Sequence, residues 1–189
     1  VLPVEPGTVV DKLSAGDILL KGANAIDPFG NLGVLMASAN GGTMGQFYMP
    51  MKARGLEIIY PVGLEKLIPS VEEAARYGGT LAIGKAIGIP VGMACVCDGR
   101  PFTEIDALEA LFDVAAVHYA SGGWGGAEGC VTIVVEGPDD GVTKCVDFIE
   151  TKIKGEPALP GVKGPCKSCF MTHCSFHGKD EAQLPAYLK

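Results

Sequence analysis

The chain has 189 residues, a hydrophobic content of 48% and a formal net charge of −7. The hydrophobic content is enough for a packed core and excludes a largely disordered chain, while the acidic balance argues against a nucleic-acid-binding protein, which normally carries a basic face. No apolar run approaches the roughly 20 residues that cross a bilayer, and no signal segment is visible, so we expect a cytoplasmic protein with no membrane partner.

Strand-like apolar runs alternate with segments of helical spacing along most of the chain. One helix has a clear start signal, because Glu73 follows Ser70 at the spacing of a capping box and Gly78 then ends the pattern. The expected strands cover residues 18–21, 34–37, 56–62, 91–96, 113–119 and 130–135, and the expected helices cover residues 44–54, 69–77, 85–88, 103–112 and 142–154.

Strands that alternate with helices through short loops are typical of an α/β protein. We therefore predict a mostly parallel sheet with right-handed crossovers and helices on both faces. A Pro/Gly-rich linker, residues 155–165, separates this predicted ligand-binding domain, residues 1–154, from a Cys/His-rich tail, residues 166–189. Ligands of such folds bind beyond the carboxyl ends of the strands, where we expect the glycine-rich loops of this chain.

Two glycine-rich loops surround the short apolar strand expected at residues 34–37. Glycine lets a ligand approach the main chain closely, and the start of the following helix offers free N–H groups and a positive dipole to an anion. Simple tight turns of an α/β protein are the alternative interpretation of these glycines. The predicted ligand-binding residues of the two loops are Gly22, Asn24, Gly41, Gly42 and Thr43.

A third glycine-rich loop follows the strand expected at residues 113–119. The backbone around Gly122 and Gly123 could bind an oxyanion or a phosphate, and Glu128 could act there as a nucleophile or base. A turn with a solvated glutamate is the alternative. Lys66 is a candidate for neutralising a bound anion, although an ordinary surface lysine would look the same.

Asp27 is the acidic residue of the first glycine-rich loop. Burial could raise its pKa and make it a general base, so we predict a catalytic role for Asp27 together with Glu128. The sequence Asp27-Pro28 also fits a plain turn, and this alternative stays open.

The tail contains Cys166, Cys169, Cys174 and His177 within twelve residues. Two cysteines separated by two residues can bind one metal through a tight turn, and three cysteines with one histidine form a sensible zinc site. An iron–sulfur cluster is the second possibility, with these three cysteines and a fourth ligand from elsewhere. A disordered or redox-scrambled tail is the alternative. The odd number of cysteines, seven, also favours thiols or metal ligands over a disulfide framework.

Three segments resemble the NagB/RpiA/CoA-transferase-like superfamily. The run from Gly22 to Asp27, followed by Gly30-Asn31, resembles the "GAD-x-I" loop of DeoR-type sugar-phosphate sensor domains and methylthioribose phosphate isomerases. Gly42-Thr43 stands at the matching helix start of those isomerases. Residues 62–72 are similar to the "GIEKLVPTLED" segment of lactate-utilisation (LUD) domains, which also carry a Gly-Ala-Asn loop. The resemblance implies a Rossmann-like fold that binds sugar phosphates, CoA or related anions.

Two departures bear on this resemblance. Asn24 stands where the sugar-phosphate members have Asp, and an amide cannot act as a carboxylate base, which puts isomerase chemistry in doubt. LUD proteins often carry ferredoxin-like cysteines, but the tail lacks their C-x2-C-x2-C-x3-C run.

The residues and the resemblance together lead to three hypotheses of function. The first is an enzyme acting on an anionic small metabolite, either an isomerase or an acyl/CoA transferase. The second is a metabolite-sensing or regulatory domain of the same fold. The third is an iron–sulfur-linked accessory protein for redox chemistry. A homo-oligomer is compatible with each of them.

Overall fold

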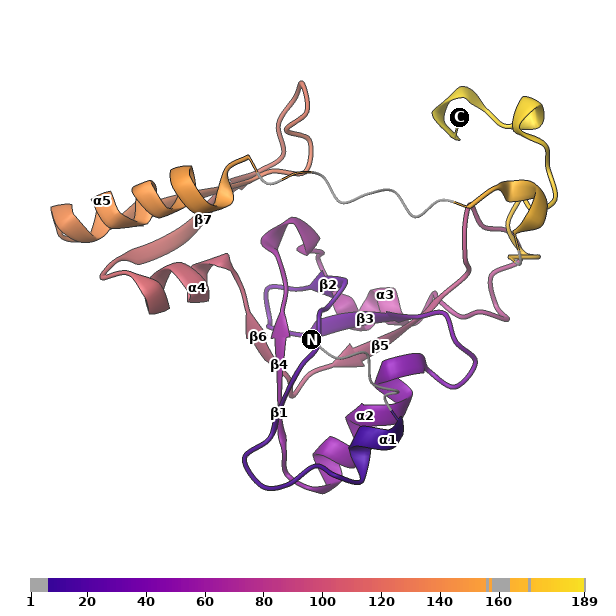
Figure 1. Ribbon diagram of the computed structural model, residues 1–189, viewed down its shortest axis with the longest axis horizontal. Coiled ribbons are helices and arrows are strands. Elements are labelled where there is room, and N and C mark those ends of the chain that lie inside the picture. Colours follow the sequence, from indigo (N-terminus) through magenta and orange to yellow (C-terminus); the bar gives the residue numbers. More distant parts are fainter. Residues whose placement is uncertain (1–6, 156, 158–163, 170, 189) are drawn as a thin grey trace.

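The computed structural model describes residues 7–155, 157, 164–169 and 171–188. It confirms an α/β protein, but the strands form three small sheets (Figure 1). The expectation of one mostly parallel sheet is wrong, because only one of these sheets is parallel. Part of the reason is physical: the loops after residues 26 and 121 are too short for a crossover, which needs a dozen or more residues, so the chain turns back antiparallel.

The parallel sheet has the order β1-β4-β6. Its strands are β1 (Ile18–Leu20), β4 (Glu57–Pro61) and β6 (Arg100–Phe102). The first two strands were expected, but β6 lies in a segment that the sequence indicates as a turn.

The second sheet is antiparallel and has the order β2-β3-β5. Its strands are β2 (Ala25–Ile26), β3 (Leu32–Met36) and β5 (Gly92–Val96). Gly33 is closely packed in β3, where a Cβ would lie 2.8 Å from the Met93 sulfur and 3.0 Å from the Ala25 Cβ.

The main core lies between these two sheets and helix α2 (Gly42–Ala53). Met51 of α2 and Tyr60 of β4 are fully buried there, next to Leu32 of β3. Helix α1 (Gly7–Val10) packs on α2. Pro50 near the end of α2 does not prevent the helix from continuing to Ala53.

The predicted cap of the third helix is confirmed. Helix α3 (Val71–Ala75) begins after Ser70, whose Oγ accepts a hydrogen bond of 3.1 Å from the Glu73 N–H. Helix α4 (Glu104–Leu111) begins with a capping box between Thr103 and Asp106. The short helix expected at residues 85–88 is wrong, since this segment forms an isolated bridge at Ala86 followed by a bend.

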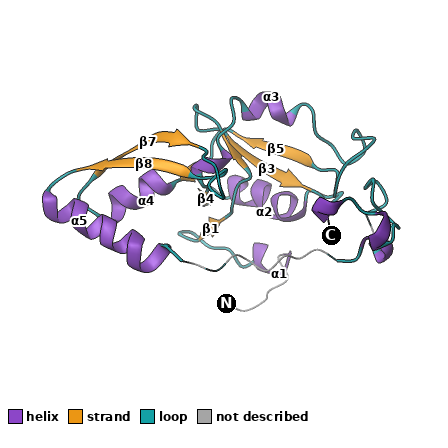
Figure 2. Ribbon diagram, turned by 90° about the horizontal axis from the view of Figure 1, so that it is seen from above, coloured by secondary structure: helices purple, strands orange, loops and turns teal. Residues whose placement is uncertain are grey.

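The remaining elements form a separate hairpin module. Strands β7 (Ala115–Ser121) and β8 (Val131–Glu136) pair antiparallel, and helix α5 (Asp139–Phe148) continues as a π-helical segment, Ile149–Ile153. Figure 2 shows α4 and α5 on one side of this hairpin. Leu108, Ala116 and Cys145 form a second, smaller core between them.

The C-terminal segment consists of short 3₁₀ turns at Cys166–Ser168, Glu181–Gln183 and Ala186–Leu188. It contacts the body through a parallel bridge between Ala86 and Cys174, where the Ser175 N–H donates to the Ala86 carbonyl at 2.9 Å. Most of the predicted linker, residues 155–165, lies outside the described residues. Within the described part of the chain, no helix is long and apolar enough to cross a membrane.

Candidate functional site

Three cysteines of the C-terminal segment line one cavity of about 430 Å³. Cys166 comes from the first 3₁₀ turn, and Cys169 and Cys174 follow it along the chain. The rest of the wall is largely apolar and comes from two parts of the chain. Ile87 and Gly88 belong to the body, and Met171, Phe176 and Leu188 belong to the C-terminal segment.

Backbone N–H groups point at two of the three sulfurs. The Met171 N–H donates to the Cys169 Sγ at 3.5 Å, and the Phe176 N–H donates to the Cys174 Sγ at 3.4 Å. Both donors lie two residues after their cysteine. A further donor, the Gly88 N–H of the body, lies 3.2 Å from the Cys174 Sγ. Such hydrogen bonds stabilise a thiolate, which is the form of cysteine that binds metals.

The same donors change the acidity of Cys174. The N–H groups of Phe176 and then Gly88 hold the pKa of the Cys174 thiol below its ordinary value, against the opposing effect of burial. All seven cysteines are free thiols in the structure.

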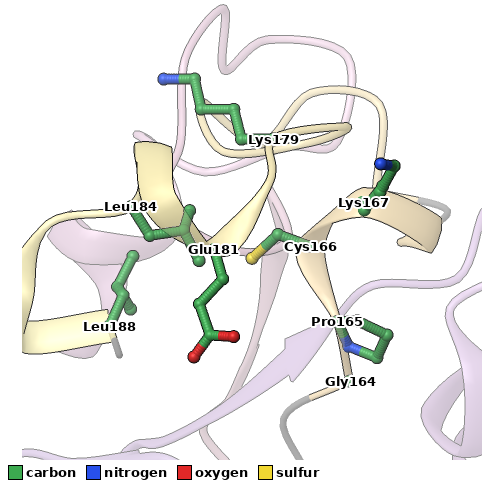
Figure 3. A pocket seen from close by; sticks show the side chains of 8 residues that line it. All are labelled: Gly164, Pro165, Cys166, Lys167, Lys179, Glu181, Leu184 and Leu188. Carbon is green, nitrogen blue, oxygen red and sulfur yellow. The ribbon is translucent and has the colours of Figure 1, made fainter.

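Cys166 also lines a second cavity, of about 230 Å³, which shares Gly164 and Leu188 with the first. Figure 3 shows its sulfur on the side of Glu181, with Leu184 and Leu188 further along the wall. An ion pair of 2.7 Å between Lys167 Nζ and Asp180 Oδ1 ties the two ends of this segment together.

The four predicted metal ligands do not meet at one point. His177 is exposed and does not line the cavity, and its backbone N–H donates to the Cys174 carbonyl at 3.0 Å. Within residues 7–155 and the described parts of the C-terminal segment, no three His, Cys, Asp or Glu side chains are grouped so that they could hold a metal ion. The structure therefore brings the three cysteines to one cavity without forming a compact single-ion site.

Asp27 is buried, with 3% of its surface exposed, and its carboxylate accepts four hydrogen bonds. Oδ1 accepts from the N–H groups of Phe29 and Asn31, and Oδ2 accepts from the Asn31 side chain and the Val71 N–H, all at 3.0 Å. Burial alone would raise the pKa of Asp27, but these donors, first that of Val71, lower it. This is the arrangement of a structural carboxylate, and a role as general base stays a prediction.

Asn24 and Gly22 follow the first parallel strand. The Asn24 Oδ1 accepts from the Leu35 N–H at 3.0 Å, so this side chain holds β3 in place. A Cβ on Gly22 would meet the Pro61 carbonyl at 4.0 Å, which is ordinary contact. Lys66 lies in the 3₁₀ turn Leu64–Lys66 after β4, where it pairs with Glu65. Gly22 and Lys66 thus follow the carboxyl ends of adjacent parallel strands.

The second loop forms the start of α2. Gly41 is its N-cap with a φ of +78°, and Gly42 follows with a φ of +57°. No side chain caps the helix at Gly41, although the Asn40 Oδ1 accepts from the Gly42 N–H at 3.2 Å. Thr43 is exposed in the first turn of α2.

The third loop connects β7 and β8. Gly122 has a φ of +86°, and its N–H donates to the Cys130 carbonyl at 2.9 Å, which closes the hairpin. A Cβ on Gly123 would lie 2.7 Å from the Ala127 carbonyl oxygen. Glu128 is exposed, and its carboxylate accepts from the Gly126 N–H at 3.2 Å, one of the hydrogen bonds that lower its pKa.

These three loops do not form one site. In Figure 1 the β7–β8 loop lies at the top of the molecule, away from the loop that precedes α2. The predicted convergence depended on a single parallel sheet, and the loops separate because the strands belong to three sheets. Binding of an anionic metabolite to any one of these loops stays a prediction.

The sequence analysis missed a polar cluster between α2 and the turn after β5. Asp98 accepts from the Tyr48 hydroxyl at 2.9 Å and pairs with Lys52 at 2.6 Å. The Tyr60 hydroxyl is buried next to this cluster and has no hydrogen-bond partner among the described residues. Burial, together with Asp98, raises the pKa values of Tyr48 and Tyr60 to about 12. The sequence signal nearest to this cluster is the turn after β5, which contains Asp98 and Gly99.

Comparisons of this chain with protein-family models, with curated proteins and with solved structures give no match.

Proposed function

We propose that this protein is a metal–thiolate protein, whose C-terminal segment holds an iron–sulfur cluster through Cys166, Cys169 and Cys174. The observation that carries the proposal is that three cysteine side chains line one largely apolar cavity, while backbone N–H groups donate to two of their sulfurs. Hydrogen bonds to the ligand sulfurs and an apolar surround are two of the factors by which proteins tune such clusters.

The size of the cavity favours a cluster over a single zinc ion. Zinc–sulfur distances of about 2.3 Å place tetrahedral ligands roughly 3.8 Å apart, so a zinc site is compact. No such compact group exists among the described residues, and the cavity, at about 430 Å³, is far larger than one ion needs. A cluster spreads its cysteine ligands over several iron atoms, so the proposal places it in the cavity that Cys166, Cys169 and Cys174 line.

The body of the protein takes part in the proposed site. Gly88 donates its N–H to Cys174, and Ile87 contributes to the apolar wall. A cluster bound here would supply one-electron transfer, so the protein would act as an electron carrier or as a redox accessory to a partner. The fourth ligand would then be a solvent or partner atom.

The test is analysis of protein purified without oxygen. We expect iron and acid-labile sulfide in similar amounts, and a visible absorption band that dithionite bleaches. Cys169→Ser and Cys174→Ser should each lower the iron content at least about tenfold. Cys95→Ser is the matched control, because Cys95 is an exposed thiol on β5 that does not line the cavity.

The outcomes separate the alternatives. Zinc without iron or sulfide, lost in Cys169→Ser but not in Cys95→Ser, would overturn the cluster and leave a structural zinc site. Protein without any bound metal, even after anaerobic reconstitution with iron and sulfide, would refute the proposal as a whole.

A further inference from the structure

The hairpin module leaves one face of its sheet uncovered. Helices α4 and α5 pack on one side of β7 and β8, as Figure 2 shows. On the opposite side, Val117, Tyr119 and Val134 are exposed. A sheet of only two strands is marginally stable in water, and three or more strands are the usual requirement. This module would therefore gain stability from additional strands.

Strand β8 offers a free edge for such an addition. Its described backbone hydrogen bonds all go to β7, so its other edge has unpaired N–H and C=O groups. Residues 131–135 are uncharged and contain no proline, so the usual protections of an edge strand are missing. Strand β7 differs, because a register shift between His118 and Ala120 interrupts its regular pairing.

An apolar groove of about 290 Å³ lies beside β8 on the helix side of the sheet. Val146 of α5 and Ile149 of the π-helical segment that follows it form one wall and are 50% and 39% exposed. Val131, Ile133 and Val135 of β8 form the facing wall. The free edge and the exposed apolar side chains therefore belong to one continuous surface.

We propose that this surface binds a second copy of the chain, with β8 pairing antiparallel to β8 of the second copy in a four-stranded sheet. A two-fold axis perpendicular to the sheet relates two such strands, so residues directly opposite each other share a face. With the axis at Ile133, this residue faces its own copy and Val131 faces Val135 of the second copy. Helix α5 of each copy then lies on the same face, where the two apolar grooves adjoin.

The charges of this surface fit a second copy. Glu136 is the only charged residue of β8, and in this register it faces Cys130 of the second copy, so no like charges meet along the strands. Two lysines near this surface are paired locally: Lys144 of α5 contacts Asp140, and Lys154, which follows the π-helical segment, contacts Glu150 of the groove wall. The proposed interface is thus apolar at its centre, and the one charged residue of β8, Glu136, lies at the end of the strand.

Sedimentation velocity of the full-length protein under reducing conditions tests the dimer. We expect wild type to be dimeric at tens of micromolar, and Val146→Glu to raise the dimer dissociation constant at least about tenfold, because two carboxylates would meet across the axis. Val117→Glu is the matched control. It makes the same change at an exposed valine on the other face of the sheet, and it should leave the dimer intact.

Disulfide cross-linking tests the register. Directly opposite residues have the separation that a disulfide requires, so Ile133→Cys should form a covalent dimer under mild oxidation. Val134→Cys and wild type, treated in the same way, should cross-link much less.

Three results would overturn the proposal. A wild-type monomer at 100 micromolar excludes the dimer, and equal dissociation of Val146→Glu and Val117→Glu excludes this surface. A dimer in which Ile133→Cys cross-links no faster than wild type excludes the proposed pairing of β8.

Discussion

Asp27 provides the sharpest test of how this fold is held together, because one buried carboxylate joins two segments of the chain. It accepts hydrogen bonds from its own loop, at Phe29 and Asn31, and from the N–H of Val71 at the start of α3. Replacing Asp27 by alanine removes all of these acceptors at once. The perturbation therefore reports directly on a structural role.

The expected loss in the free energy of unfolding depends on which of the freed N–H donors can be hydrated. The loop donors near Phe29 lie close to the surface and can be hydrated, whereas Val71 is fully buried. A buried donor left without an acceptor costs about 1–3 kcal/mol, and hydrogen bonds to a charged acceptor contribute about 1.5–3 kcal/mol each. We therefore expect Asp27→Ala to lower the free energy of unfolding by about 3 kcal/mol.

The assay is urea unfolding at pH 7, followed by far-ultraviolet circular dichroism. Asp17→Ala is the matched control, since Asp17 is exposed and accepts hydrogen bonds only from Ser14. The control should lower the free energy of unfolding by less than about 1 kcal/mol. If Asp27→Ala were as stable as this control, the carboxylate would not hold the two segments together and the structural interpretation would be refuted.

Three further predictions use the same unfolding measurement. Donors lower the pKa of Asp27 in the folded state, so its contribution to stability is present above about pH 4 and is lost as the pH falls further, and the difference between wild type and Asp27→Ala should shrink between pH 5 and pH 2.5. A difference that grows with acid would contradict the sign of this pKa shift. Ser70→Ala should cost about 1 kcal/mol because it removes the cap of α3, whereas Ser70→Gly should cost only a few tenths. Equal losses in the two variants would show that the Ser70 side chain is not the cause. Met51→Ala should cost about 2–5 kcal/mol, because Met51 is fully buried in the main core, and a loss below 1 kcal/mol would mean that the core collapses around the gap.

Local signals in the sequence predicted local structure well. The capping pattern at Ser70 and Glu73 marks the start of α3, and the helical spacing after Thr103 marks α4. Both are confirmed because a cap depends on residues within one turn of the chain. The strands β1, β4 and β5 were also expected close to their observed bounds.

The pairing of the strands was the main error, because apolar runs do not encode a partner. Residues 113–119 and 130–135 were both expected as strands, but the loop between them contains no helix signal. That absence is typical of an antiparallel hairpin, and it could have identified β7 and β8 as partners. Strand β6 was missed for another reason: it has three residues, too few for any periodicity to show.

Part of the candidate metal centre could be predicted from the sequence, and part could not. The spacing of Cys166 and Cys169 predicts that these two thiols lie close together, since they belong to one turn. The sequence contains no signal that Gly88, 86 residues before Cys174, donates its N–H to that sulfur. This contact depends on the bridge at Ala86, and it makes the body part of the cavity wall. A metal bound by the three thiols would therefore fix the C-terminal segment to the body, and metal loading should slow amide exchange at Gly88 as well as in the segment itself.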